Sequence, residues 1–327
     1  MILGGDIGGT KTSLALARLV DGTPRIILER RYPSQEWGDF EALLRAFLDE
    51  ADVGESIASA CFGVAGPVVD NRAKVTYLPW VVDGKALAET FDLGVAEVVN
   101  DFVAAAQGVA TLQSDDLVTL QEGCPLERSP RLLIGAGTGL GVAALIPQGN
   151  GWRTLGGEGG HIGFSPANEE QLIVWRHLLE PGGRTPGRVT AENVISGPGL
   201  VAIYESLVKV SLQNTAIADP AGIVAAVPDN PLAARALDLF IAAYGAFAGD
   251  LALLFMARGG VYLGGGIAPK ILPHLKDGGF VRAFGARGAH AGLMQDFPIR
   301  VITNERLGLL GALSIAAAHT NTLDSRQ

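Results

Sequence analysis

Three short segments of the sequence carry side chains that are suited to binding and activating hydroxyl groups. Asn100 and Asp101 follow an apolar run, Glu158 and His161 lie on the glycine frame Gly-Gly-Glu-Gly-Gly-His, and Glu192 lies in Thr-Ala-Glu-Asn-Val-Ile-Ser-Gly. A carboxylate can accept the proton of an alcohol, and an amide can bind a neighbouring hydroxyl. A carboxylate and an imidazole on a glycine frame suit a loop that wraps a small polar ligand.

Two of these candidates, Asp101 and Glu192, also have a plainer interpretation. Asp101 stands directly before a helical run that starts at Phe102, where a carboxylate can serve only as the helix cap. Glu192, taken alone, fits a solvated surface residue. Both interpretations stay open at this point.

Glycine-rich runs offer a second kind of chemistry, the binding of phosphate by backbone N–H groups. The first run is Gly4-Gly-Asp6-Ile-Gly8-Gly9-Thr10-Lys11-Thr12, and others surround Gly137-Thr138-Gly139 and Gly264-Gly265-Gly266. A backbone without Cβ atoms approaches a phosphate closely, and turn N–H groups bind anions. The first run has the glycine spacing of a P-loop, but Thr10 replaces the required Lys and a strand follows.

Asp6 ends the first apolar segment and is a candidate for holding a hydrated magnesium ion. The alternative is an ordinary glycine-rich hairpin in which Asp6 is a turn residue.

Two further runs fit the permissive dinucleotide fingerprint. Residues 139–144 leave no room for the required helix, because Pro147-Gln-Gly-Asn-Gly follows at once. Residues 197–202 open a helix, but no strand ending in an acidic residue follows it. A nicotinamide oxidoreductase is therefore a minor alternative.

The elements that position these groups alternate between strand-like and helix-like runs, which predicts an α/β chain. Apolar strands at 1–6 and 12–20 place the first glycine run in a hairpin turn, and 96–100 places Asn100 and Asp101 at the carboxyl end of a strand. Further strands are predicted at 25–30, 56–64, 259–264 and 299–303, and helices at 39–51, 102–112, 169–180, 199–213, 231–257 and 308–319.

The surroundings of Gly9-Thr10 and Gly137-Thr138 are similar: an apolar run, a glycine turn and a strand of small residues. This internal similarity suggests two related α/β halves that face each other across a cleft.

Composition narrows the class of protein. The length of 327 residues suits two domains, and the net charge of −9 argues against a nucleic-acid partner. Two cysteines and scattered histidines do not make a disulfide framework or a zinc site. The most apolar stretch contains Asp238 and Asp250, and the first residues have no basic segment, so we expect a cytoplasmic protein without a membrane span.

Taken together and in order, these motifs resemble the bacterial glucokinases of the sugar kinase, Hsp70 and actin superfamily. The resemblance spans nearly the whole chain and rests on Asp6-Ile-Gly-Gly-Thr-Lys-Thr, Asn100-Asp-Phe, Gly135-Ala-Gly-Thr-Gly-Leu-Gly, Gly157-Glu-Gly-Gly-His, Ser196-Gly-Pro-Gly and Gly264-Gly-Gly-Ile.

The resemblance implies a two-domain ribonuclease H-like (actin-like ATPase) α/β fold with a ligand cleft between the domains. The small domain would comprise residues 1–110 plus 304–327, and the large domain residues 111–303. The implied activity is ATP-dependent phosphorylation of the 6-hydroxyl of glucose, giving glucose 6-phosphate and ADP. The implied assembly is a homodimer.

The resemblance also assigns roles to residues. Asp101 would be the general base. Asn100, Glu158, His161 and Glu192 would bind the sugar hydroxyls. Magnesium would bridge the phosphates near Asp6. The ATP-binding residues would be Asp6, Gly8, Gly9, Thr10, Lys11, Thr12, Gly137, Thr138, Gly139, Gly264, Gly265 and Gly266.

One position departs from the family pattern: Tyr77 stands where the family usually has the Asn that edges the sugar pocket. Two alternatives remain, a kinase for fructose, mannose or an N-acetyl sugar, and a non-catalytic nucleotide-binding switch of the same superfamily. Chaperone and filament members lack the Asn-Asp and Glu-Gly-Gly-His motifs, which disfavours the switch.

Overall fold

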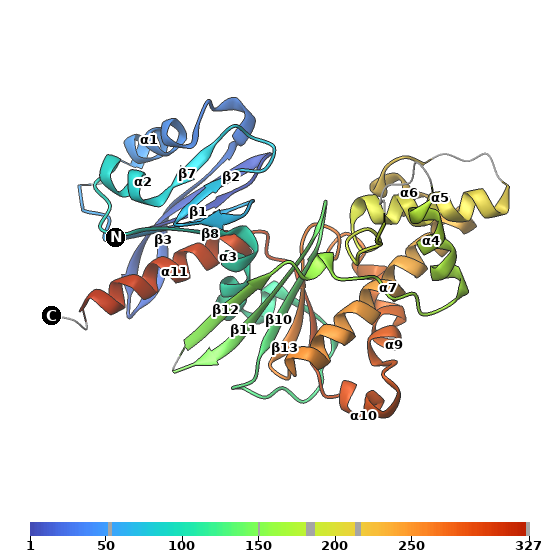
Figure 1. Cartoon of the computed structure of the whole chain (residues 1–327). Helices are drawn as coiled ribbons and strands as arrows, with labels where there is room; N and C mark the ends of the chain where they lie inside the picture. The colour runs from blue at the N-terminus through green and yellow to red at the C-terminus, as the bar shows by residue number, and fades with distance from the viewer. Residues whose placement is uncertain (52–53, 150, 181–186, 213–216, 325–327) are drawn as a thin grey trace. The chain divides into compact units, whose positions relative to one another are not determined.

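The computed structural model describes residues 1–51, 54–149, 151–180, 187–212 and 217–324. Its contacts divide the chain into two compact units (Figure 1). The first unit consists of Met1–Gln113, Gln148–Gly156 and Asn304–Gln327, and the second of Ser114–Pro147 and Gly157–Thr303.

The first unit is built on a mixed sheet with the strand order β3-β2-β1-β4-β8. β1 pairs antiparallel with β2 and parallel with β4, which in turn pairs parallel with β8. The register sets Ile7 beside Val64 and Val64 beside Asn100, so three strands end together at one edge of the sheet. The strands are β1 (Ile2–Ile7), β2 (Lys11–Val20), β3 (Thr23–Pro33), β4 (Ser59–Val64) and β8 (Ala96–Asn100).

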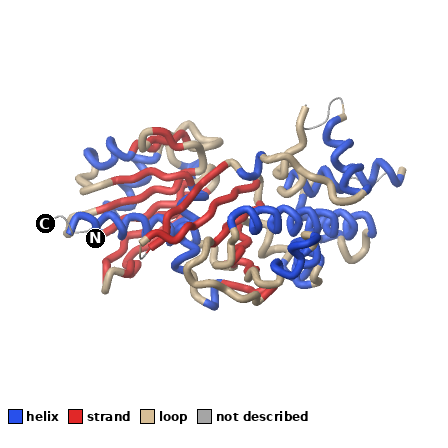
Figure 2. The backbone as a smooth tube through the Cα atoms, turned by 60° about the horizontal axis from the view of Figure 1, so that its bottom comes forward, coloured by secondary structure: helices blue, strands red, loops and turns tan. Residues whose placement is uncertain are grey.

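Helices cover both faces of this sheet (Figure 1). α1 (Phe40–Ala51) buries Phe40 edge-on against Phe62 of β4, as the apolar face of the predicted helix requires. The opposite face is covered by α11 (Leu307–Asp324), which lies beside α3 (Asp101–Gly108). In Figure 2 the strands of this unit again lie between helices.

The first unit also contains a second, small sheet, which the sequence pattern did not predict. It has the order β5-β6-β7, with β5 (Val68–Val69), β6 (Arg72–Lys74) and β7 (Val81–Asp83), and leads into α2 (Gly84–Thr90). Trp80 precedes β7 and is fully buried, with its indole N–H donated to the carbonyl of Trp37 at 3.2 Å. Trp80 therefore belongs to the core.

Five strands of the second unit, together with β12, form a six-stranded sheet with the order β12-β11-β10-β13-β14-β9, and most of β12 is grouped with the first unit. β10 pairs antiparallel with β11 and parallel with β13, just as β1 pairs with β2 and β4. The internal similarity between the Gly9-Thr10 and Gly137-Thr138 segments therefore corresponds to a repeated arrangement of strands. The strands are β9 (Leu117–Gln121), β10 (Arg131–Ala136), β11 (Leu140–Gln148), β12 (Gly151–Gly157), β13 (Gly260–Gly264) and β14 (Ile299–Ile302).

The helices of the second unit are packed around α7 (Pro231–Phe255). Of the described helices, only α7 is long and apolar enough to span a membrane, and it is mostly buried within this unit. Its apolar surface thus belongs to the core. The other helices are α4 (Glu169–Leu179), α5 (Gly197–Ser211), α6 (Pro220–Ala226), α8 (Leu272–Lys276), α9 (Gly279–Gly285) and α10 (Ala291–Met294).

Candidate active site

Asn100 caps the helix that Asp101 begins. The Asn100 Oδ1 accepts hydrogen bonds from the N–H groups of Phe102 at 2.9 Å and Val103 at 3.3 Å, and its Nδ2 donates to the carbonyl of Gly66 at 3.2 Å. The capping role thus falls to Asn100, although the Asp101 Oδ1 also lies 2.9 Å from the Phe102 nitrogen. The cap interpretation of Asp101 is therefore not needed to explain where the helix starts.

Asp6 lies near the same sheet edge, on β1. Burial, the strongest effect, and the negative charge of Asp101 raise the pKa of Asp6 to about 6, against the opposing charges of Lys11 and Arg31. Two carboxylates thus repel each other at this edge.

The repulsion between Asp6 and Asp101 bears on whether these residues fit a magnesium ion. The described residues hold no cluster of three or more potential metal ligands. Mg²⁺, however, is commonly held by one or two carboxylates together with substrate phosphates and water. A divalent cation would also relieve the repulsion between Asp6 and Asp101, so these residues fit a magnesium ion that arrives with a nucleotide.

The turn between β1 and β2 is held in shape by Ser34. The Ser34 hydroxyl donates to the carbonyl of Gly8 at 2.7 Å and lies 2.9 Å from the Thr12 Oγ1, while its N–H donates to the carbonyl of Thr10 at 3.0 Å. Thr12 is fully buried, whereas Thr10 and Lys11 are exposed. Thr12, one of the predicted phosphate-binding residues in this turn, therefore faces the interior. Ser34, which supports the turn, was not predicted from the sequence.

In the second unit, the turn after β10 lies against the start of α5. The N–H of Gly137 donates to the carbonyl of Gly139 at 2.8 Å, and the N–H of Gly197 donates to the carbonyl of Gly137 at 2.8 Å. Ser196 caps α5 by accepting from the Gly199 N–H at 3.1 Å. The phosphate turn, which is the predicted phosphate-binding segment Gly137-Thr138-Gly139, thus lies beside the amino end of α5. The N–H groups of a turn and the amino end of a helix both attract anions.

The third predicted nucleotide-binding turn follows β13. Gly265 has a φ of +79°, and a Cβ atom there would come within 2.4 Å of the carbonyl oxygen of Ala136. Both the backbone conformation and the close contact require glycine at this position. The turn therefore packs against the end of β10, with Gly265 and Gly266 exposed.

Glu158 and His161 extend from a short 3₁₀ turn into solvent. Their side chains are 87% and 57% exposed, and the His161 Nε2 lies 3.8 Å from the Glu158 Oε2. Glu192 differs, because it is partly buried and its Oε2 accepts the N–H of Leu140 at 2.8 Å. Glu192 is therefore not a solvated surface residue.

Glu192 also lines a cavity of about 120 Å³ beside the phosphate turn. Its other lining residues are Thr138, Leu178, Asn193, Ser196 and Pro198. The structure thus brings Thr138 and Glu192 to one cavity, and Asp6, Asn100 and Asp101 to one sheet edge of the first unit.

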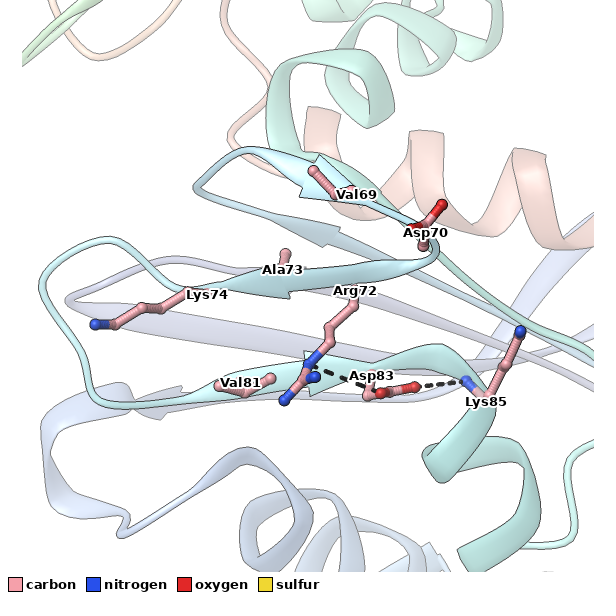
Figure 3. A pocket seen from close by; sticks show the side chains of 8 residues that line it. All are labelled: Val69, Asp70, Arg72, Ala73, Lys74, Val81, Asp83 and Lys85. Carbon is pink, nitrogen blue, oxygen red and sulfur yellow. Dashed lines mark hydrogen bonds and ion pairs between the residues drawn. The ribbon is translucent and has the colours of Figure 1, made fainter.

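A larger surface groove lies over β6 and β7 and contains none of the predicted site residues (Figure 3). Within it, the Arg72 Nε lies 3.8 Å from the Asp83 Oδ2, and the Asp83 Oδ1 accepts the N–H of Lys85 at 3.1 Å as part of the α2 cap. Asp83 is thus explained by the helix start, and the groove is not the candidate active site.

Comparison with known proteins decides the family. The sequence matches the glucokinase family over residues 3–319. The chain belongs to the glucokinase family. A glucokinase from Nostoc sp. (strain PCC 7120) is 38% identical over 97% of this chain and 99% of its own length.

Solved structures agree with this membership. A glucokinase from an Antarctic psychrotroph has a TM-score of 0.87 and 28% identity, covering 97% of this chain and 98% of its own. A ROK family glucokinase from Streptomyces griseus, solved with glucose and AMPPNP, has a TM-score of 0.62 and 22% identity, covering 97% and 99%. The predicted two-domain, actin-like ATPase fold is confirmed.

Proposed function

We propose that this chain transfers the γ-phosphoryl group of ATP to the 6-hydroxyl of glucose, with Asp101 as the general base. Family membership makes the chain an ATP-dependent glucose kinase. The observation that carries the residue assignment is the position of Asp101 at the carboxyl end of β8, at the same edge as Asp6 and the glycine turn. Reacting groups in α/β sheets gather at such an edge.

In the proposed reaction, the glucose 6-oxygen forms a bond to the γ-phosphorus while the bond from that phosphorus to the β,γ-bridging oxygen breaks. ADP leaves, and the hydroxyl proton passes to the Asp101 carboxylate. Such a transfer depends mainly on positioning and charge stabilisation.

Backbone N–H groups would supply much of that stabilisation. We assign the phosphates to Gly8, Gly9, Thr10 and Lys11 in the first unit, and to Gly137, Thr138 and Gly139 beside α5 in the second. Gly264, Gly265 and Gly266 would lie against the adenosine. Asp6 would hold the magnesium ion of MgATP, which neutralises phosphate charge when bound. We assign Thr12 to support of the turn, because its hydroxyl is buried against Ser34.

Four polar side chains would orient the sugar: Asn100, Glu158, His161 and Glu192. The amide of Asn100 has a second N–H beyond the one bonded to Gly66, which suits a sugar hydroxyl. Glu158 and His161 are exposed on a glycine frame, as hydroxyl-binding groups need to be.

We also propose the functional domains given by the sequence, residues 1–110 plus 304–327 and residues 111–303. The division of contacts near Gln113 and Asn304 supports this assignment. The family further suggests a cytoplasmic homodimer, which size-exclusion chromatography with light scattering would test.

The deciding experiment measures ATP-dependent glucose phosphorylation by the wild type and by Asp101→Asn, with glucose binding measured alongside. Removing a general base costs roughly 10²–10⁴ in rate. We expect a kcat loss of that size with glucose affinity nearly unchanged. The matched control is Asp83→Asn, which keeps a helix cap on α2 and lies outside the site.

Full activity in Asp101→Asn would overturn the assignment of the base. A panel of glucose, fructose, mannose and N-acetylglucosamine in the same assay tests the sugar. A preference for another hexose would replace glucose as the substrate, and ATP hydrolysis unaffected by any sugar would indicate a nucleotide switch.

A further inference from the structure

The side chain of Glu192 bonds to the phosphate turn rather than only facing a ligand. Its Oε2 accepts the backbone N–H of Leu140 at 2.8 Å, directly after Gly137-Thr138-Gly139. A Cβ atom on Gly139 would come within 2.7 Å of the same oxygen, so the carboxylate lies against the turn. A charge-assisted bond of this kind is stronger than one between neutral groups.

The backbone of Glu192 bonds to the other predicted sugar loop. Its N–H donates to the carbonyl of Gly160 at 2.9 Å, and Gly160 lies between Glu158 and His161. Gly160 is itself pressed on Leu140, because a Cβ atom there would come within 2.1 Å of the Leu140 carbonyl oxygen. The sugar loop, Glu192 and the phosphate turn are thus in direct contact.

We infer that Glu192 is a positioning residue that couples sugar binding to nucleotide binding. This inference rests on the proposed function, which gives Glu192 to the sugar and Gly137-Thr138-Gly139 to the phosphates. A carboxylate offers two oxygens and about four acceptor positions, so it can hold the Leu140 N–H and receive a sugar hydroxyl together. A bound sugar then fixes the carboxylate, and the fixed carboxylate holds the phosphate turn in one conformation.

Binding free energies make this coupling reciprocal: if glucose tightens nucleotide binding by some factor, the nucleotide tightens glucose binding by the same factor. Glu158 provides the contrast. It is a predicted sugar ligand of the same type, yet its side chain is 87% exposed and its carboxylate makes no hydrogen bond to the phosphate turn among the described residues. Loss of Glu158 should therefore weaken sugar binding alone.

The experiment is calorimetric titration of Mg²⁺–AMPPNP, with and without saturating glucose, into wild type, Glu192→Ala and Glu158→Ala. We expect glucose to tighten AMPPNP binding to the wild type severalfold. In Glu192→Ala, AMPPNP binding without sugar should weaken about tenfold, the scale of a lost charge-assisted hydrogen bond, and glucose should no longer tighten it. In Glu158→Ala, AMPPNP binding without sugar should equal that of the wild type.

Two more variants separate positioning from general damage. Glu192→Gln retains an oxygen that can accept the Leu140 N–H, so it should restore most of the AMPPNP affinity. Gly139→Ala keeps the glutamate but displaces its carboxylate, so glucose should no longer tighten AMPPNP binding to this variant. Thermal unfolding of each variant confirms that the protein remains folded.

The inference is overturned if AMPPNP binds folded Glu192→Ala and wild type equally in the absence of sugar, or if glucose has no effect on AMPPNP binding to the wild type. Failure of the proposed function looks different: the wild type would bind AMPPNP but would not phosphorylate any hexose.

Discussion

The carboxylate of Asp6 lies against the first turn of α11, where a Cβ atom on Gly308 would come within 2.8 Å of the Asp6 Oδ2. Only a residue without a side chain leaves the carboxylate where it is. Gly308 is therefore a support for the proposed magnesium ligand, although it lies far from Asp6 in the sequence.

Gly308→Ala should lower activity without unfolding the protein. Alanine favours a helix over glycine by about 1 kcal/mol, which offsets part of the crowding. The displaced Asp6 carboxylate should raise the magnesium concentration needed for half-maximal activity by about tenfold, while the glucose KM changes little. A magnesium titration of initial rates checks this, and an unchanged magnesium requirement would contradict it.

Asp6 should also make stability depend on pH. Its pKa is about 6 in the folded protein and 3.8 ordinarily, so between these values the folded state holds a proton that the unfolded state has lost. Stability therefore falls as pH rises through this window, by up to about 3 kcal/mol, and stays lower above it.

Asp6→Asn cannot ionise and should lack this fall. In urea unfolding with EDTA, the variant should be more stable than the wild type at pH 7.5, and this difference should shrink as the pH is lowered to 4.5, with little activity at either pH. Parallel loss of stability in both proteins as the pH rises would show that Asp6 is not the cause.

Tyr77 should reduce stability through its backbone. It has a φ of +66° and is 86% exposed, so the left-handed conformation is not offset by burial of the ring. Such a conformation costs a residue with a Cβ atom roughly 1–2 kcal/mol, and Asn tolerates it better. Tyr77→Asn should therefore stabilise the protein by about 1 kcal/mol in chemical denaturation.

Leu212→Asn is the matched control for Tyr77→Asn. Leu212 has a φ of +55° and is 93% exposed at the end of α5, so the gain in stability should be similar. Only Tyr77 lies near the glycine turn, since its Cβ would be 3.5 Å from a Cβ on Gly9. The glucose KM should therefore change in Tyr77→Asn alone, and an equal change in both would refute this account.

Gly311 should be essential for the fold. A Cβ atom there would come within 1.7 Å of the carbonyl oxygen of Ala104, because α11 and α3 touch at their backbones. Gly311→Ala should cost about 3 kcal/mol or more, or prevent soluble expression. Gly285→Ala, in α9 with open space around it, should stay within about 0.5 kcal/mol of the wild type.

The elements predicted from the sequence are those with a strong local pattern. The apolar face of α1 and the short strand that ends at Asn100 were found because each depends on residues near one another in the chain. The glycine hairpin between β1 and β2 was found for the same reason. The short strands of the small sheet have too few residues to show alternation.

The features that the sequence did not reveal depend on the folded structure, and most of them on contacts between residues that are distant in the chain. Asn and Asp both cap helices, so the pattern did not reveal that Asn100 performs this role. Thr12 was grouped with the phosphate-binding residues, whereas the pairing of β1 with β2 turns it toward Ser34. Only the folded chain brings Glu192 to Leu140, 52 positions away.

The placement of α11 determines the order in which the chain can complete its fold during synthesis. The strands β1, β4 and β8 leave the ribosome early, but the sheet face that carries Cys61 is covered by Leu309 and Leu313, which are translated after the whole second unit. That face stays exposed to water throughout this interval, and exposed apolar sheets aggregate. Slow translation of the segments between residues 114 and 303 that form the second unit therefore prolongs the period in which this apolar face is open to aggregation, while faster synthesis shortens it.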